Sequence, residues 1–178
     1  MSGEEFLRAL QKRRSVRNYS GEKVPMEKLN LILEAGMLAP SGRAIRPYEL
    51  IVVRDKQKLI GLSGCRMGGA ARMLAGADFA IVVVADEEKS DTWTEDASVV
   101  MENMHLMASV LGVGSCWIQG RGREAIDRGT TEDYVRAILQ FPQECRLEAI
   151  LSLGMPESEW PETSLETLPF EKIHINKF

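Results

Sequence analysis

A short basic segment, Arg13-Arg14-Ser15-Val16-Arg17, carries the side chains best suited to chemistry with an anion. Three guanidinium groups within these five residues repel one another unless a negative charge lies between them. Arginine presents forked donors that match a phosphate, and the serine hydroxyl adds a donor at short range. Basic residues also occur at the ends of ordinary helices, where they interact with the helix dipole. The segment therefore indicates either an anion site or a solvated helix end.

The composition limits what such an anion can be. The chain has 178 residues, 44% of them hydrophobic and 27% charged, which fits one globular domain over residues 1–178. Its net charge of −4 argues against a nucleic-acid binder, which needs a basic face. The basic residues gather instead around 12–17, 43–46 and 121–123, as expected for one small anion. No apolar run is long enough for a membrane span and no signal peptide is apparent, so we expect a cytoplasmic protein.

The other reactive residue types give little sign of chemistry. Three cysteines without metal-like pairs predict neither a disulfide framework nor a zinc site. Cys116 has apolar and aromatic neighbours, which favour a buried, unreactive thiol. His105 and His174 belong to different predicted elements, and neither shows a pairing with a nucleophile. Both histidines are therefore interpreted as structural.

The periodicity of the sequence predicts the elements that position these residues. Helices are expected over 3–13, 26–38, 55–62, 91–111 and 131–140, and strands over 48–54, 78–85, 145–154 and from Ser115 onward. The continuous apolar run 78–85 indicates a strand buried on both faces. The helix 91–111 is apolar around most of its circumference, which predicts a core or a dimer interface. After a proline-containing arm over 155–169, alternation around Ile173 and Ile175 predicts a terminal strand, placed to pair away from its own sheet.

Three blocks of sequence stand out together. They are the basic segment, then Ala39-Pro40-Ser41-Gly42-Arg43 followed by Arg46-Pro47-Tyr48, and then Gly112-Val113-Gly114-Ser115-Cys116-Trp117-Ile118-Gln119. In this order and at this spacing they resemble the FMN-dependent nitroreductase family, from about residue 10 to the C-terminus. The resemblance implies an α+β fold with three α/β/α layers around a central mixed, mostly antiparallel sheet. It also implies an intertwined homodimer with an exchanged C-terminal strand.

The residues that the resemblance assigns to FMN come from three segments. The first contacts the phosphate, the ribityl chain and the pyrimidine ring, and the second reaches the flavin from the other subunit. The third lines the opposite edge of the ring, where the backbone N–H of Gln119 faces flavin N5. In chain order these residues are Arg13, Arg14, Ser15 and Arg17; Pro40, Ser41, Gly42 and Arg43; and Trp117, Ile118, Gln119 and Gly120. The flavin itself carries the chemistry, and neither a metal nor a catalytic side chain is implied.

The chain departs from the family pattern at several positions. Ala44, Arg46 and Tyr48 stand where many members have Asn, Gln and Trp. Glu166 occupies the region where larger members carry a cation for the phosphate. Arg121 and Arg123 are candidates to replace that charge, because the chain resembles a compact subgroup of the family that has Arg at the same places. The alternative is that these are two exposed loop arginines.

The resemblance implies an NAD(P)H-dependent flavin oxidoreductase that reduces nitroaromatic, quinone or related acceptors by a ping-pong mechanism. No Gly-x-Gly-x-x-Gly fingerprint opens a βαβ unit, so NADH or NADPH is expected to be a transient hydride donor. Two alternatives stay open. One is the same scaffold with reductive removal of a substituent or a reaction with oxygen, and the other is a flavin-binding protein without turnover. The acceptor, the choice of nicotinamide and the role of the segment from Cys65 to Leu74 are not assigned.

Overall fold

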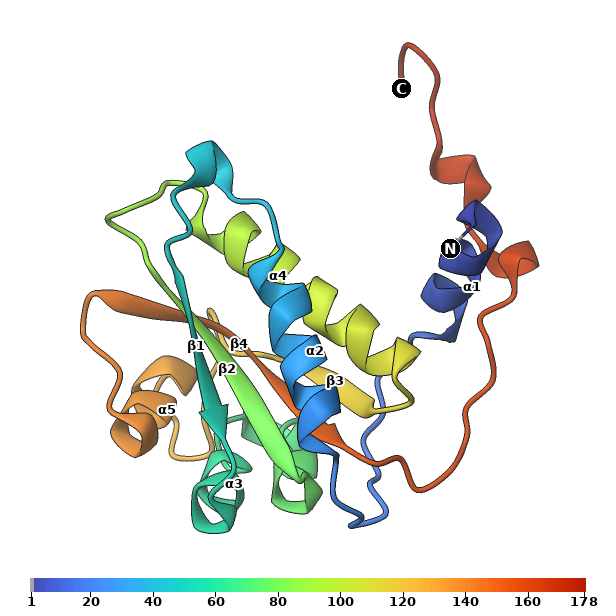
Figure 1. The fold of residues 1–178 in the computed structure, drawn as a ribbon. Coiled ribbons are helices and arrows are strands. Elements are labelled where there is room, and N and C mark those ends of the chain that lie inside the picture. The colour runs from blue at the N-terminus through green and yellow to red at the C-terminus, as the bar shows by residue number, and fades with distance from the viewer. Residues whose placement is uncertain (1) are drawn as a thin grey trace.

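The computed structural model describes residues 2–178, which form one antiparallel sheet with helices on both faces (Figure 1). The strands are β1 (Tyr48–Val53), β2 (Phe79–Asp86), β3 (Gly114–Gln119) and β4 (Cys145–Gly154). They pair in the order β1-β2-β4-β3, and each of the three pairings is antiparallel. Within the described residues, the parallel part of the expected mixed sheet is one isolated bridge between Ser15 and Ser115. The mostly antiparallel sheet is thus confirmed.

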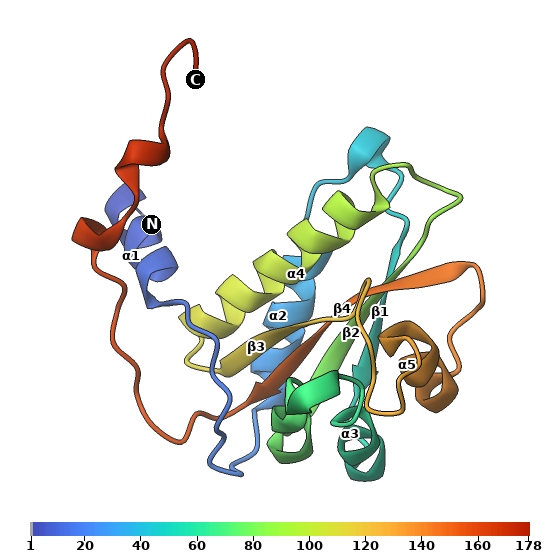
Figure 2. The ribbon, with the colours of Figure 1, turned by 180° about the vertical axis from the view of Figure 1, so that it is seen from behind.

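The helices form two layers around this sheet. Their bounds are α1 (Gly3–Lys12), α2 (Met26–Met37), α3 (Lys56–Leu62), α4 (Trp93–Val110) and α5 (Thr131–Leu139), with short 3-10 turns η1 (Gly42–Ala44), η2 (Met67–Gly69), η3 (Arg72–Gly76), η4 (Leu165–Thr167) and η5 (Phe170–Lys172). α2 and α4 cover one face of the sheet, and α3 and α5 cover the other (Figures 1 and 2). This arrangement confirms the three α/β/α layers. Over residues 2–178, none of the helices has the length and apolar character that crossing a membrane requires.

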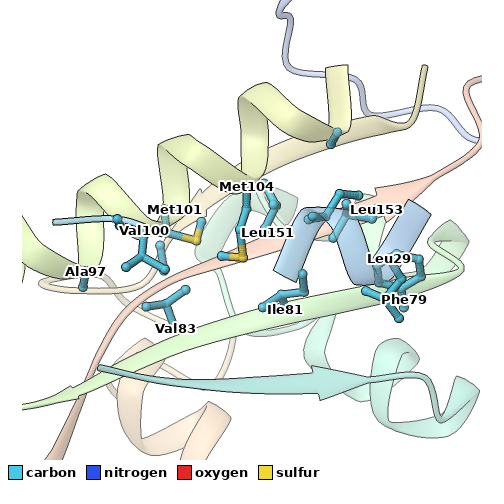
Figure 3. Packing of buried hydrophobic residues seen from close by; sticks show 14 of the residues in the cluster. Leu29, Phe79, Ile81, Val83, Ala97, Val100, Met101, Met104, Leu151 and Leu153 are labelled. Carbon is cyan, nitrogen blue, oxygen red and sulfur yellow. The ribbon is translucent and has the colours of Figure 1, made fainter. Parts of the chain in front are cut away.

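β2 explains how one sheet supports two cores. All eight of its residues are buried, because alternate side chains enter opposite layers. Ile81 and Val83 pack with Met101 and Met104 on the side of α2 and α4 (Figure 3). Val82 and its alternate neighbours pack on the side of α3 and α5. The strand predicted to be buried on both faces is confirmed.

α4 is the long helix predicted over 91–111, and it buries one face in the single chain. Met101, Met104 and Ala108 are fully buried against the sheet and α2. On the other face, Val99 and Val110 stay 38% and 62% exposed. Burial around nearly the whole circumference is therefore not reached within one chain.

α1 and the C-terminal arm lie side by side, away from the sheet (Figures 1 and 2). The backbone N–H of Thr163 donates to the carbonyl of Gln11 at 2.9 Å, and the Trp160 indole donates to the carbonyl of Lys12. The arm reaches α1 from residue 154, at the end of β4. α1 and the residues after about 160 therefore form one projection from the body of the molecule.

The terminal strand predicted around Ile173 and Ile175 does not form in the single chain, and its exchange with a partner stays a prediction. The 3-10 turn η5 and bends replace it, and the two isoleucines are 67% and 80% exposed. A strand needs a neighbouring strand to satisfy its N–H and C=O groups, and the sheet of the same chain offers none at this place. The alternating pattern thus describes a segment without a partner in its own chain.

Candidate functional site

The basic segment follows α1 and lies beside the first residues of β3. The chain becomes extended at Arg13, and the bridge from Ser15 to Ser115 holds it against the strand. The backbone N–H of Val16 donates to the carbonyl of Ser115 at 2.8 Å. Gly114 permits this approach, because a Cβ there would lie 2.8 Å from Val16 Cγ1. The pairing fixes the backbone of the segment and leaves the Ser15 side chain exposed.

Two of the three arginines in this segment have only neutral partners. Arg14 donates to Thr163 Oγ1 at 3.3 Å, and Arg17 donates to the carbonyl of Ser15 at 3.3 Å. In the part of the chain that the structure describes, neither guanidinium forms an ion pair. Both side chains are exposed. Two positive charges without carboxylates, held close to an ordered strand end, fit an anionic ligand.

The third arginine, Arg13, is held by α4. Its NH1 lies 3.1 Å from His105 Nε2, and its Nε lies 3.7 Å from Glu102 Oε1. His105 Nδ1 lies 2.7 Å from Ser115 Oγ. Burial, with the Arg13 charge beside it, lowers the pKa of His105 to about 4, so the imidazole is neutral at pH 7. The histidine is therefore buried with both ring nitrogens hydrogen-bonded.

The loop predicted to reach a flavin forms the strained turn η1 against the first turn of α4. The N–H of Gly42 donates to the buried carboxylate of Asp96 at 2.8 Å, and a Cβ on Gly42 would collide with Thr92 Oγ1. The hydroxyl of Ser41 accepts from the N–H of Arg46 at 2.7 Å. Positive φ angles of 53°, 57° and 52° occur at the non-glycine residues Arg43, Ala44 and Arg46. Such angles cost on the order of 1–3 kcal/mol each and concentrate at functional turns.

The structure does not bring this loop to the basic segment of its own chain. The loop meets α4 at its first turn, whereas Arg13 meets α4 nine residues further on, about 13 Å along the axis at 1.5 Å per residue. Pro40 is exposed, and Arg43 forms an exposed ion pair with Asp91. One chain therefore carries two separate halves of the predicted site. Contribution of the loop to the other subunit stays a prediction.

The far end of β3 is tied to a buried carboxylate, Glu148 of β4. The Gln119 side-chain amide donates to Glu148 Oε1 at 3.1 Å, and Arg121 Nε donates to Oε2 at 2.9 Å. The Trp117 indole donates to Gln119 Oε1 at 2.9 Å. The backbone N–H groups of Gly120 and Arg121 both donate to the carbonyl of Glu148 at 3.0 Å. This network fixes the segment that is expected to line the ring.

Two residues of this segment can offer a ligand only their backbone. Ile118 is 3% exposed and packs in the core on the side of α3 and α5. Gly120 has no side chain, and a Cβ there would lie 2.6 Å from Leu147 Cδ2. Glycine is thus required where the chain turns away from β4.

Arg121 and Arg123 lie beyond the end of β3 opposite to the basic segment. The four-residue step from Ser115 to Gln119 alone spans about 13 Å at 3.3 Å per residue. Arg121 pairs with Glu148, whereas Arg123 is exposed and has no ion pair in residues 2–178. Both line a cavity of about 540 Å³ at the start of α5. Their contact with a phosphate stays a prediction, and Arg121 already has a carboxylate partner.

Arg66 is a candidate site residue that the sequence did not reveal. It lies in the glycine-rich segment before η2, and its NH1 donates to the carbonyl of Gln119 at 2.5 Å. Its buried Nε has no hydrogen-bond partner among the described residues. Nothing in the pattern of residues 64–76 distinguishes this arginine from its neighbours. Glu148 did carry a signal, because it is a carboxylate inside the apolar run 147–151 of a predicted strand.

Comparison with known proteins places this geometry in a family. The family model described as Nitroreductase family matches residues 10–70 and 62–155. An Archaeoglobus fulgidus protein, provisionally named NADH dehydrogenase/NAD(P)H nitroreductase, is 38% identical over 160 residues, which cover 88% of each chain. An FMN-dependent nitroreductase from Clostridium difficile superposes with a TM-score of 0.93 at 44% identity, over 97% of this chain and 99% of that one. A protein from Desulfovibrio desulfuricans, provisionally named a nitroreductase and solved in complex with FMN, superposes with a TM-score of 0.78 at 27% identity, over 99% of both chains. The chain therefore belongs to the nitroreductase family.

Proposed function

We propose that this chain is an FMN-dependent oxidoreductase. It takes a hydride from NADH or NADPH and passes electrons to a nitroaromatic, a quinone or a related acceptor in a ping-pong cycle. The observation that supports this most directly is the pair of guanidinium groups of Arg14 and Arg17, which lie beside the start of β3 and have no carboxylate partner within residues 2–178. Family membership and the names of the relatives support the same function.

The residues present fit FMN at two places. The basic segment offers arginine and serine donors for a phosphate. Near Gln119, Arg66 offers a buried Nε–H that has no acceptor among the residues that the structure describes. The edge of the flavin ring that carries carbonyl groups would supply an acceptor for the Arg66 Nε–H. When bound, FMN supplies the hydride chemistry, so the task of the chain is to bind and orient it. We assign this task to Arg13, Arg14, Ser15 and Arg17 at the phosphate end and to Trp117, Ile118, Gln119 and Gly120 at the ring, with the Gln119 backbone N–H toward flavin N5.

We propose that a second copy of the chain completes the site and that the enzyme is a cytoplasmic homodimer. The loop Pro40–Arg43 lies apart from the basic segment of its own chain, as a loop serving the partner would. The projection formed by α1 and the tail exposes large apolar side chains, among them Phe6, Phe170, Ile173 and Ile175. Exposed apolar clusters of this kind mark association surfaces. The exchanged C-terminal strand is then the tail pairing with the partner.

An absorbance spectrum followed by anaerobic reduction tests the proposed function. The purified chain, reconstituted with FMN and desalted, is expected to keep about one flavin per chain and to bleach when NADH or NADPH is added. Subsequent addition of a nitroaromatic, a quinone, a halogenated phenol or oxygen identifies the acceptor class. Rapid reoxidation by the halogenated phenol with release of halide would favour reductive substituent removal instead. A flavin that neither nicotinamide reduces would point to a binding protein without turnover, and failure to retain FMN would contradict the proposal.

A further inference from the structure

We propose that His105 is a positioning residue for the phosphate site, and that it holds Arg13 through a hydrogen bond that only a neutral imidazole can accept. This inference rests on the proposed function, because it takes Arg13 to be a ligand of the FMN phosphate. The histidine is 2% exposed and lies on α4 behind the basic segment. It would therefore act on the cofactor through the arginine, without touching it.

The partners of His105 determine its tautomer. A guanidinium has N–H donors only, so Nε2, which lies 3.1 Å from Arg13 NH1, accepts and carries no proton. A neutral imidazole then carries its proton on Nδ1, which donates to Ser115 Oγ at 2.7 Å. The hydrogen bonds run in one direction, from Arg13 through His105 to Ser115. They join the basic segment, α4 and β3 at the point where Ser15 bridges to Ser115.

This arrangement leaves Arg13 available to a ligand. The bond to His105 uses one of the five N–H donors of a guanidinium, and the Arg13 side chain is still 33% exposed. Glu102, one turn earlier on α4, lies 3.7 Å from Arg13 Nε and restrains the same group. A side chain already held in one rotamer loses less conformational entropy when a ligand binds. The expected benefit is a phosphate donor set that is ordered before FMN arrives.

The charge state of His105 determines whether its Nε2 can accept the hydrogen bond from Arg13. The charged group that faces the ring is Arg13 from the basic segment, and β3 contributes the neutral Ser115. Glu102, on the same helix as His105, lies against Arg13. Protonation at Nε2 would remove the acceptor and place an imidazolium against a guanidinium. Burial and Arg13 lower the pKa of His105 to about 4, so the imidazole remains an acceptor through the neutral range. The bond is lost only as the pH falls toward that value.

Two substitutions at this position separate positioning from simple core packing. In His105→Leu the ring is replaced by an apolar side chain of similar bulk, which cannot accept from Arg13. In His105→Gln the side-chain carbonyl can accept from Arg13 while the amide donates to Ser115. At pH 7, His105→Leu is expected to lower the affinity for FMN about tenfold and to leave the affinity for riboflavin, which has no phosphate, within twofold. His105→Gln is expected to retain most of the affinity for FMN.

Titrations of FMN and riboflavin between pH 7 and pH 3.5, a range that crosses the pKa of His105, supply the readout that a packing role would not move. Below about pH 4.5, where His105 takes up its proton, the wild-type chain is expected to lose FMN more steeply than His105→Gln. The shallower loss that both share reflects protonation of the FMN phosphate, whose second pKa lies near 6. Superimposable pH profiles for the two chains would overturn the inference, even if His105→Leu does not fold. So would a folded His105→Leu that keeps the wild-type preference for FMN over riboflavin.

Arg13→Ala distinguishes failure of this inference from failure of the proposed site. A selective loss of FMN in Arg13→Ala, together with wild-type binding in His105→Leu, would leave Arg13 as a phosphate ligand and remove the role of the histidine. Wild-type binding of FMN by Arg13→Ala would show that Arg13 is not a phosphate ligand and would overturn this inference, while Arg14 and Arg17 are tested by their own variants. We expect Arg13→Ala and His105→Leu to lose affinity for FMN but not for riboflavin, and His105→Gln to retain most of the affinity for FMN.

Discussion

Arg14 and Arg17 differ from most charged residues near α1 because they make no ion pair in the described chain. Arg8 and Lys12 both pair with Glu162, and Arg13 lies near Glu102. The nearby carboxylates, Glu162 and Glu102, lie against other basic residues, and the guanidinium groups of Arg14 and Arg17 are exposed. A phosphate group would supply the missing charge without displacing an existing pair.

Replacing Arg14 or Arg17 with Ala is expected to weaken FMN by about tenfold to a hundredfold. A charged hydrogen bond contributes roughly 1.5–3 kcal/mol, and 1.4 kcal/mol is about one power of ten in affinity. Binding of riboflavin should stay within about twofold, which fluorescence titration of both flavins can measure. Arg54→Ala removes the same charge from an exposed arginine after β1 and serves as control. Equal losses for the two flavins would contradict the phosphate role.

The same titration extends to Arg123, the other phosphate candidate that has no ion pair in residues 2–178. A loss of FMN affinity in Arg123→Glu that shrinks as salt rises would support its contact with the phosphate. An unchanged titration would assign the phosphate to the basic segment. Arg121 is less informative, because its removal also leaves the buried carboxylate of Glu148 without a cation.

The helices and strands were largely readable from the sequence, since they depend on local periodicity. β4 was predicted at 145–154 and spans Cys145–Gly154, and the eight buried residues of β2 follow from an unbroken apolar run. The terminal strand does not form in the single chain, because alternation at Ile173 and Ile175 predicts a strand with one buried face but does not identify the strand that pairs with it. Arg66 and Asp96 could not be predicted, because their contacts with Gln119 and Gly42 join segments more than 50 residues apart. Side-chain encounters of this kind depend on the folded sheet.

The turn η1 depends on its contact with α4, and Gly42→Ala tests that dependence. The added Cβ collides with Thr92 Oγ1 and pushes the loop from the helix, which is expected to cost about 1–3 kcal/mol of unfolding free energy. If the loop completes the partner's site, the affinity for FMN falls as well. Thr92→Ala removes the obstructing atom, so the double variant should recover much of both losses. Gly3→Ala, where a Cβ meets nothing within 4 Å, is the control. Thermal melting and FMN titration measure the outcome, and wild-type values for Gly42→Ala would contradict the proposed fit.

The projection formed by α1 and the residues after about 160 exposes apolar surface that the rest of the single chain does not cover. Its exposed apolar residues continue to the last residue, Phe178, and no part of the same sheet approaches them (Figures 1 and 2). A folded protein keeps such a surface when another molecule covers it. The exposed side of α4, at Val99 and Val110, is a second surface that one chain leaves open.

Deleting residues 168–178 is expected to abolish the dimer and the retention of FMN together. The deletion removes Phe170, Ile173 and Ile175 but no residue that packs in either core. Sedimentation velocity measures the association state, and the ratio of flavin to protein absorbance measures retention. Removing only residues 176–178 keeps both isoleucines and provides a comparison that should remain dimeric. A monomer of the long deletion that still holds stoichiometric FMN would disprove the link between the tail and the site.

The strand order delays completion of the sheet until late in the synthesis of the chain. β4 lies between β2 and β3 in the sheet but is the last strand to be translated. Until residue 154 has left the ribosome, β3 has no strand to pair with, and Gln119 to Arg121 lack the Glu148 groups that fix them. Contacts of such long sequence separation also form slowly. The nascent chain thus exposes an open edge of β2 from the time that β2 emerges until β4 follows it, and the proposed cofactor site can form only after that.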